Sequence, residues 1–88
     1  MQTITLSVMN PLGLHARASI KLVDLAARFQ GSVQLVVRGR TIDAKDILQV
    51  MSVGAAQGST VELIVEGPEE QQALAAIEDL FKPGIGEI

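Results

Sequence analysis

Three short runs of alternating apolar and polar residues constrain the fold more than any other feature of this sequence. They span residues 3–8, 32–37 and 60–66. A side-chain period of two is that of a β-strand, and this alternation leaves one face of each strand largely polar. Because strands with one polar face suit a sheet that is open to water on one side, the pattern favours an antiparallel sheet. A tight hairpin at Gly39 is expected to lead into a fourth strand at residues 41–43.

Helical spacing of apolar residues fills the stretches between these strands. The first helix follows a turn at Gly13 and is predicted to end at Gly31, a residue type that commonly ends helices. The second begins after Asp46, an acidic cap followed three residues later by glutamine, and ends near Gly54. The third begins near Pro68, since proline suits the first turn of a helix. The order βαββαβα predicts an α+β fold, an open-faced two-layer sandwich with a four-stranded antiparallel sheet and helices on one face.

The composition restricts the size of the core and the chemistry available to the chain. With 88 residues, 48% of them hydrophobic, we expect one domain over residues 1–88. Zero cysteines and one histidine exclude thiol chemistry and leave too few ligands for a structural zinc site, so we expect no metal and no cofactor. A net charge of −3 and the presence of only two aromatic residues argue against nucleic-acid binding.

Hydropathy and charge also bear on location and partners. The sequence has no apolar run long enough to span a bilayer and no basic segment followed by an apolar run at its start, so we expect a cytoplasmic protein without membrane insertion. We also expect a monomer. Residues 1–45 carry a net charge of +4, and residues 46–88 carry −7. Such segregation can steer the first half towards acidic partners, although solvated faces alone could produce it.

His15, the only histidine, stands where the strand period changes to a helical one. A side chain at such a turn faces the first-turn N–H groups and the positive end of the helix dipole, which favour an anion. Arg17 and Lys21 are four residues apart and therefore share a helix face. These cations favour a neutral imidazole, which could attack phosphorus, and they would stabilise the attached phosphoryl group. From spacing alone, a histidine with only a structural hydrogen bond is the more common alternative.

Several segments of the sequence resemble a known family. Residues 13–17, Gly-Leu-His-Ala-Arg, are similar to the active-site signature of HPr, the histidine-containing phosphocarrier of the bacterial phosphoenolpyruvate-dependent phosphotransferase system. The resemblance extends over essentially the whole chain. Further similar segments, at matching spacing, are residues 45–48, 51–54, 57–58 and 66–67.

The chain departs from the family signature at two positions. It has Ala18 where the family usually has proline, and Leu12 where the family often has asparagine. Alanine continues a helix well but does not fix its first turn as proline does. We therefore expect the two departures to affect the rate of phosphoryl transfer rather than its existence.

The resemblance implies a phosphocarrier rather than an enzyme with its own turnover. It makes His15 the phosphoryl acceptor, Arg17 the stabilising cation and the backbone N–H groups near Ala16 and Arg17 the cradle for the anion. It also implies that the strand at residues 60–66 lies between those at 3–8 and 32–37.

The short second helix carries a candidate docking surface. Ile47, Leu48 and Met51 are expected to be partly exposed, because a short helix in a two-layer domain cannot bury its whole circumference; the alternative is that all three belong to the core. With Lys21, this surface is where the resemblance implies docking of enzyme I and the sugar-specific enzyme IIA proteins.

Asp46 is a candidate regulatory position. Many family members from low-GC Gram-positive bacteria have at this position a serine that a kinase phosphorylates. Asp46 either imitates the phosphorylated serine or simply caps the second helix. We favour the cap, because aspartate and serine are near-equivalent caps.

The favoured function is a phosphocarrier that accepts a phosphoryl group from phosphorylated enzyme I on His15 and donates it to enzyme IIA. One alternative is the nitrogen-related branch of the same family, which differs in partners rather than chemistry. Another is a regulatory interaction module that uses phosphorylation only as a switch. A small ligand-binding ferredoxin-like domain shares most of the element order, but the motif around His15 argues against it.

Overall fold

The computed structural model describes residues 1–9, 13 and 15–82 of the chain, and its element order is the βαββαβα that the periodicity predicts. Leu12, one of the two departures from the family signature, lies outside the described residues. No helix among the described residues is long and apolar enough to cross a membrane. The elements are β1 (Gln2–Ser7), α1 (Ala16–Ala26), β2 (Ser32–Val37), β3 (Arg40–Asp43), α2 (Ile47–Ser52), β4 (Thr60–Glu66) and α3 (Glu70–Phe81).

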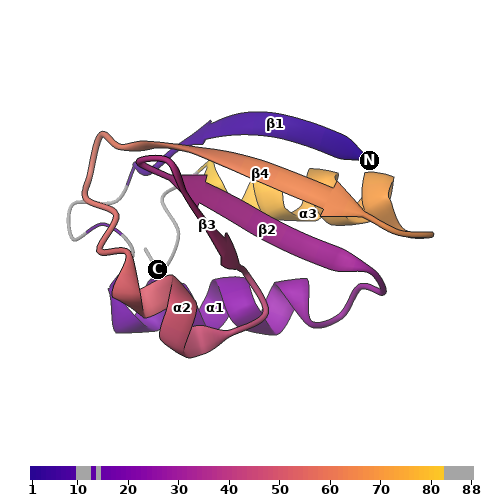
Figure 1. Cartoon of the computed structure of the whole chain (residues 1–88), viewed down its shortest axis with the longest axis horizontal. Helices are drawn as coiled ribbons and strands as arrows, with labels where there is room; N and C mark the ends of the chain where they lie inside the picture. The colour runs from indigo at the N-terminus through magenta and orange to yellow at the C-terminus, as the bar shows by residue number, and fades with distance from the viewer. Residues whose placement is uncertain (10–12, 14, 83–88) are drawn as a thin grey trace.

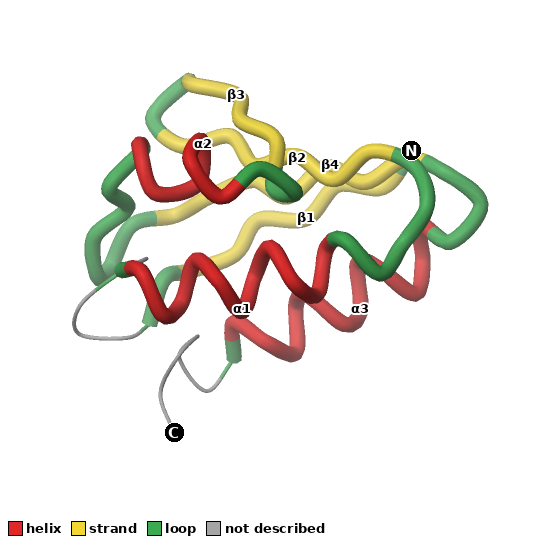
Figure 2. Tube along the Cα trace, turned by 90° about the horizontal axis from the view of Figure 1, so that it is seen from below, coloured by secondary structure: helices red, strands yellow, loops and turns green. Residues whose placement is uncertain are grey.

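The four strands form one antiparallel sheet in the order β1-β4-β2-β3. β4 therefore lies between β1 and β2, as the family resemblance implies. The three helices lie on one side of this sheet, and the other side is open (Figures 1 and 2). The alternation in β4 shows why: Val61, Leu63 and Val65 are buried, whereas the intervening Glu62 is exposed.

An aliphatic core fills the space between the sheet and the helices. α1 contributes Leu22 and the small residues Ala18 and Ala26 to this core, and its backbone lies close to those of α2 and α3. Ser19 is also fully buried, which the hydrophobic period did not predict. The largest fully buried side chains are Leu22, Leu35, Leu63, Ile77, Val8, Val33, Val37, Val50, Val61 and Val65.

The first helix is shorter than the sequence predicts. It ends at Ala26 rather than at Gly31, and Phe29 lies beyond it, partly buried. Gly31 has a φ of +97°, and a Cβ there would lie 2.0 Å from the carbonyl oxygen of Glu66. The glycine is therefore needed because two backbones pass in contact, not because it ends the helix.

Candidate functional site

His15 is the N-cap residue of α1. Its backbone is extended, with φ −75° and ψ −178°, and its carbonyl accepts the Ser19 N–H at 2.8 Å. The ring turns back onto the helix, so that Nδ1 accepts the backbone N–H of Arg17 at 3.2 Å. A ring nitrogen that accepts a hydrogen bond has a lone pair, so a neutral imidazole in this geometry carries its proton on Nε2. The half-buried ring thus presents the Nδ1 lone pair to the N-terminus of a helix.

Two cationic residues, Arg17 and Lys21, and the backbone N–H of Ala16 follow His15 closely in the sequence. The Arg17 side chain is exposed, and Lys21 follows one turn later, half-buried. Neither side chain forms a hydrogen bond or ion pair with another described residue, and the Ala16 N–H likewise has no acceptor among residues 1–9, 13 and 15–82. The family resemblance implies a cradle of N–H groups near Ala16 and Arg17. The structure adds that the Arg17 N–H is already bonded to the histidine.

Gly13, two residues before His15, lies against the segment between α2 and β4, residues 53–59. Gly13 has a φ of +64°, and a Cβ on it would lie 2.2 Å from the carbonyl oxygen of Ala55. The same segment is hydrogen-bonded to the end of β1: the Gly58 N–H donates to the Val8 carbonyl at 2.9 Å, and the Val8 N–H donates to the Ser59 carbonyl at 2.9 Å. Gly13 and the end of β1, which both precede His15 in the chain, are therefore in contact with the same segment.

Asp46 caps α2 with both of its carboxylate oxygens. Oδ1 accepts the N–H groups of Leu48 at 3.0 Å and Gln49 at 3.3 Å, and Oδ2 accepts the Gln49 side-chain amide at 3.2 Å. The predicted capping box is thus formed in a modified way, because the Gln49 amide oxygen accepts the Asp43 N–H instead of the Asp46 N–H. The Asp46 carboxylate has a complete local role as a helix cap.

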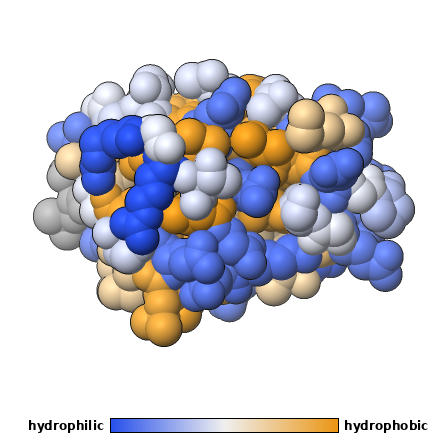
Figure 3. All heavy atoms as spheres, viewed as in Figure 1, coloured by the Kyte–Doolittle hydropathy of each residue, from blue (hydrophilic) through white to orange (hydrophobic). Residues whose placement is uncertain are grey.

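Apolar side chains on the two neighbouring helices α1 and α2 reach the surface. Leu48 is 77% exposed and Met51 46%, whereas Ile47 is half-buried, which agrees with the partial exposure expected from the sequence. Ile20, three residues after Arg17 on the same helix face, is 52% exposed and was not singled out by the sequence pattern. Figure 3 shows hydrophobic atoms protruding at the lower edge of the molecule, on the side of α2.

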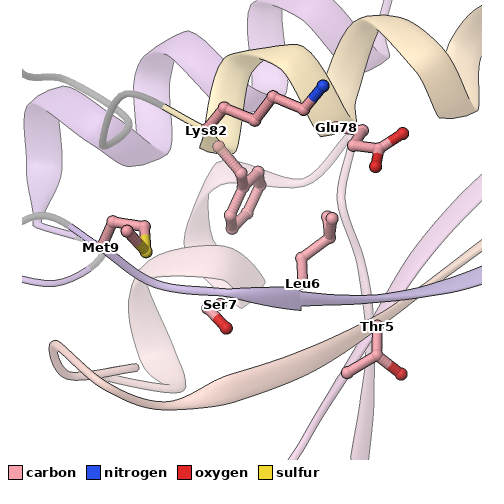
Figure 4. Close-up of a pocket in the computed structure, with 7 residues that line it drawn as sticks. Thr5, Leu6, Ser7, Met9, Glu78 and Lys82 are labelled. Carbon is pink, nitrogen blue, oxygen red and sulfur yellow. The ribbon is translucent and has the colours of Figure 1, made fainter.

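Two hollows in the surface lie apart from the histidine. One, of about 230 Å³, lies between β1 and the end of α3, and Leu6 points into it from the strand while Glu78 and Lys82 lie at the helix (Figure 4). The other, of about 280 Å³, has Lys21, Asp24 and residues of α3 and the end of α1 around it. Neither includes His15. Within the described residues, no three His, Asp or Glu side chains lie close enough together to hold a metal ion.

The fold and the helix-capping histidine are the features expected of a small phosphocarrier, and comparisons with known proteins show that the chain belongs to this class. Residues 2–83 match the family described as "PTS HPr component phosphorylation site". The phosphocarrier protein HPr of Cupriavidus necator is 47% identical over 92% of this chain and 91% of its own. A crystal structure of HPr from Thermoanaerobacter tengcongensis has a TM-score of 0.94 and 34% identity, and covers 100% of this chain and 99% of its own. A crystal structure described as an HPr dimer from the same organism has a TM-score of 0.78 and 34% identity, with 99% and 100% covered.

The chain therefore belongs to the HPr family of the phosphotransferase system, and it is a phosphoryl carrier rather than an independent enzyme.

Proposed function

We propose that this chain accepts a phosphoryl group from phosphorylated enzyme I on His15 and passes it to a histidine of an enzyme IIA. The observation that supports the proposal most is that the only histidine caps α1 with its Nδ1 lone pair at the helix N-terminus. In the transfer, the Nδ1–P bond forms as the bond between phosphorus and the donor nitrogen breaks. Nε2 keeps its proton during this step, so the ring gains positive charge beside the dianionic phosphoryl group.

The Arg17 N–H has a central part in this proposal. It donates to the Nδ1 lone pair in the free protein. Once that lone pair forms the bond to phosphorus, the same N–H can donate to a phosphoryl oxygen. The Ala16 N–H, the α1 dipole and the Arg17 guanidinium add to the stabilisation of the anion. Loading the carrier then exchanges one hydrogen-bond acceptor for another and needs no rearrangement of the helix.

The exposed side chains of α1 and α2 are the proposed docking surface for enzyme I and enzyme IIA. Leu48 and Met51 supply apolar area, half-buried Ile47 extends it, and Lys21 supplies positive charge. An apolar centre with a charged rim suits a transient interface. Carriers must leave each partner quickly, and a small surface of this kind is consistent with that need.

The chain is proposed to act as a monomer in the cytoplasm. One core, shared by the sheet and all three helices, buries most of the apolar residues of the strands within one chain. Sedimentation velocity across a range of protein concentrations would test this state against a dimer like that described for the Thermoanaerobacter tengcongensis HPr.

The test of the function is a two-stage transfer assay. Incubation with enzyme I and phosphoenolpyruvate should place an acid-labile, alkali-stable phosphate on the chain, and addition of enzyme IIA should remove it. A chain that is phosphorylated but never discharged to any enzyme IIA would be a regulatory module instead. Running the assay with the enzyme I and enzyme IIA proteins of the sugar and nitrogen branches in parallel distinguishes the two branches by rate.

A further inference from the structure

The turn between β2 and β3 contains an arginine in an unusual backbone conformation. Arg38 and Gly39 connect the paired residues Val37 and Arg40, and their φ angles are +51° and +78°. Positive φ at both central positions defines a type I′ hairpin turn, which favours asparagine or glycine at the first position. Among the described residues, Arg38 is the only one other than glycine with a positive φ. An L side chain is therefore held there against its own preference.

The side chain of Arg38 makes a contact that explains its presence. Its Nη2 donates to the carbonyl oxygen of Val53, the C-cap residue of α2. α2 has no basic residue in its own last turn, so the guanidinium supplies from another element the cation that the negative end of a helix favours. Figures 1 and 2 show the tip of the β2–β3 hairpin and the C-terminal end of α2 at the same end of the molecule.

Val53 is the first residue of the segment 53–59, which contacts Gly13. Two residues later, the buried Ala55 places its carbonyl oxygen where a Cβ of Gly13 would otherwise be, 2.2 Å away. Gly13 precedes His15 by two residues. Close-packed backbones of this kind leave no slack, so a displacement of the segment after Val53 displaces the turn before His15.

We propose that Arg38 is a positioning residue for His15. It acts through Val53 and Ala55 on the turn at Gly13, and so sets the placement of the His15 Nδ1 relative to the Arg17 N–H. The kinetic test of this inference rests on the proposed function of His15, whereas the spectroscopic test does not.

Three variants separate this role from turn strain and from net charge. Arg38→Asn suits the positive φ but has no group that reaches Val53. Arg38→Lys keeps a cation on a long stem. Arg40→Asn removes the same charge two residues later, from a side chain without a hydrogen bond or ion pair among the described residues. The measurements are the unfolding midpoint, kcat and KM of enzyme I with each variant as phosphoryl acceptor, and the ¹⁵N signals of the His15 ring and the Arg17 amide in the unphosphorylated protein.

Arg38→Asn should unfold at the wild-type temperature or above it, because the turn is relieved. Its kcat should fall by about threefold to tenfold at unchanged KM, since misplacement of a reacting group slows transfer without weakening docking. The signals of the His15 Nδ1 and the Arg17 amide should both shift. Arg38→Lys should recover part of the kcat, and Arg40→Asn should match the wild type.

A wild-type kcat for Arg38→Asn with unmoved His15 and Arg17 signals would overturn the proposal, and so would an equal loss in Arg40→Asn. If Arg38→Asn fails to fold, Arg38→Gly, which meets no backbone restriction in this turn, carries the same comparison. If the wild type takes up no phosphate at all, the proposed function fails, and the ¹⁵N comparison still decides whether Arg38 positions the ring.

Discussion

A glycine packed against a backbone carbonyl lies near each end of α1, but the two ends differ in how many polar groups are free to bind an anion. Before the helix, Gly13 packs against the carbonyl of Ala55; beyond it, Gly31 packs against the carbonyl of Glu66. Both glycines have a positive φ and neither has room for a methyl group. Each crossing therefore joins two connections that are far apart in the sequence.

At the far end, which is the crossing of residues 29–31 with residues 66–67 beyond the C-terminus of α1, side chains of the chain itself bind three polar backbone groups. The Lys45 ammonium donates to the carbonyls of Phe29 at 2.6 Å and Gly31 at 2.8 Å, and the Gln30 N–H donates to the Glu69 carboxylate at 2.9 Å. The Lys45 ammonium places positive charge beyond the C-terminal end of α1, which the helix dipole favours. Three backbone groups at this crossing are therefore occupied by side chains of the chain itself.

At the site end, which is the N-terminus of α1 at His15, the His15 Nδ1 accepts the Arg17 N–H. The Arg17 and Lys21 side chains have no partner among the described residues. The same packing device thus supports stability at one end and leaves donors for an anion at the other. The comparison predicts that changes at the far end lower stability but spare transfer. Changes at the site end should reduce transfer, whether or not they lower stability.

The largest expected effect is that of His15→Ala, which should abolish phosphorylation by enzyme I. The variant loses the only nucleophilic ring together with a helix cap, so its free energy of unfolding should fall by only about 1 kcal/mol. His15→Asn is the matched control, because asparagine caps the helix but cannot carry a phosphoryl group. Acid-labile phosphate and unfolding midpoints measured on both variants check the prediction. Phosphate on either variant would remove His15 from its proposed role.

Gly13→Ala and Gly31→Ala test the comparison directly, since each adds one methyl group at a backbone crossing. Both should lower the free energy of unfolding by about 3 kcal/mol, because a left-handed φ and an overlap with backbone add up. Only Gly13→Ala should also slow transfer per folded molecule, by moving the turn before His15. Transfer rates corrected for the folded fraction from urea titrations give the answer. Equal loss of transfer in both variants would mean that the two ends are not independent.

These crossings show where sequence reasoning was limited. The strands at residues 32–37 and 60–66 were predicted to the residue, because alternation is a local signal that the sheet uses directly. The predicted end of the first helix was wrong. Glycine is required at position 31 by a backbone contact with Glu66, 35 positions away in the chain, and no local sequence pattern reveals that contact. The hairpin at Gly39 predicted that β2 and β3 are neighbours, whereas the place of β4 between β1 and β2 was implied only by the family resemblance. The start of the helix at His15 was predicted, but the bond from the Arg17 N–H to Nδ1 depends on a side-chain rotamer that no periodicity encodes.

Arg17→Lys should slow phosphoryl transfer by about tenfold, or roughly 1.4 kcal/mol, at an unchanged unfolding midpoint. Lysine keeps the charge but loses the planar set of donors that matches a phosphoryl group, and the backbone N–H at this position is retained. Stopped-flow transfer from phosphorylated enzyme I measures the effect. An unchanged rate would indicate that the backbone donors and the helix dipole alone supply the stabilisation.

Glu70 sharpens the comparison through its pH dependence at the far end. The Met1 ammonium at 3.0 Å and the Gly67 N–H at 3.3 Å hold the pKa of Glu70 below its ordinary value. A lowered folded-state pKa adds stability at neutral pH, and this stability is lost as the pH falls through the ordinary glutamate range, about pH 4, and on towards the lowered value. Glu70→Gln should therefore reduce the acid dependence of the unfolding midpoint while leaving transfer at neutral pH unchanged. An acid dependence identical to that of the wild type would contradict this assignment.

The smallest expected effect is that of Asp46→Ser, at the start of α2. Asp46 follows Lys45, whose ammonium binds the carbonyls of Phe29 and Gly31 at the far end. Asp46 itself caps α2, the helix that carries part of the proposed docking surface. Both carboxylate oxygens are engaged in the cap, and serine can replace only the bonds that Oδ1 accepts from Leu48 and Gln49. Because serine and aspartate are near-equivalent caps, stability should change by only a few tenths of a kcal/mol, about 0.3, and transfer from enzyme I should change modestly. A carboxylate also has less charge than phosphoserine, about one unit against roughly 1.5 to 2, so imitation of the phosphorylated state would be partial. A large gain in transfer rate at an unchanged unfolding midpoint would instead show that the Asp46 charge restrains the carrier, and the position would then belong with the site end of the molecule.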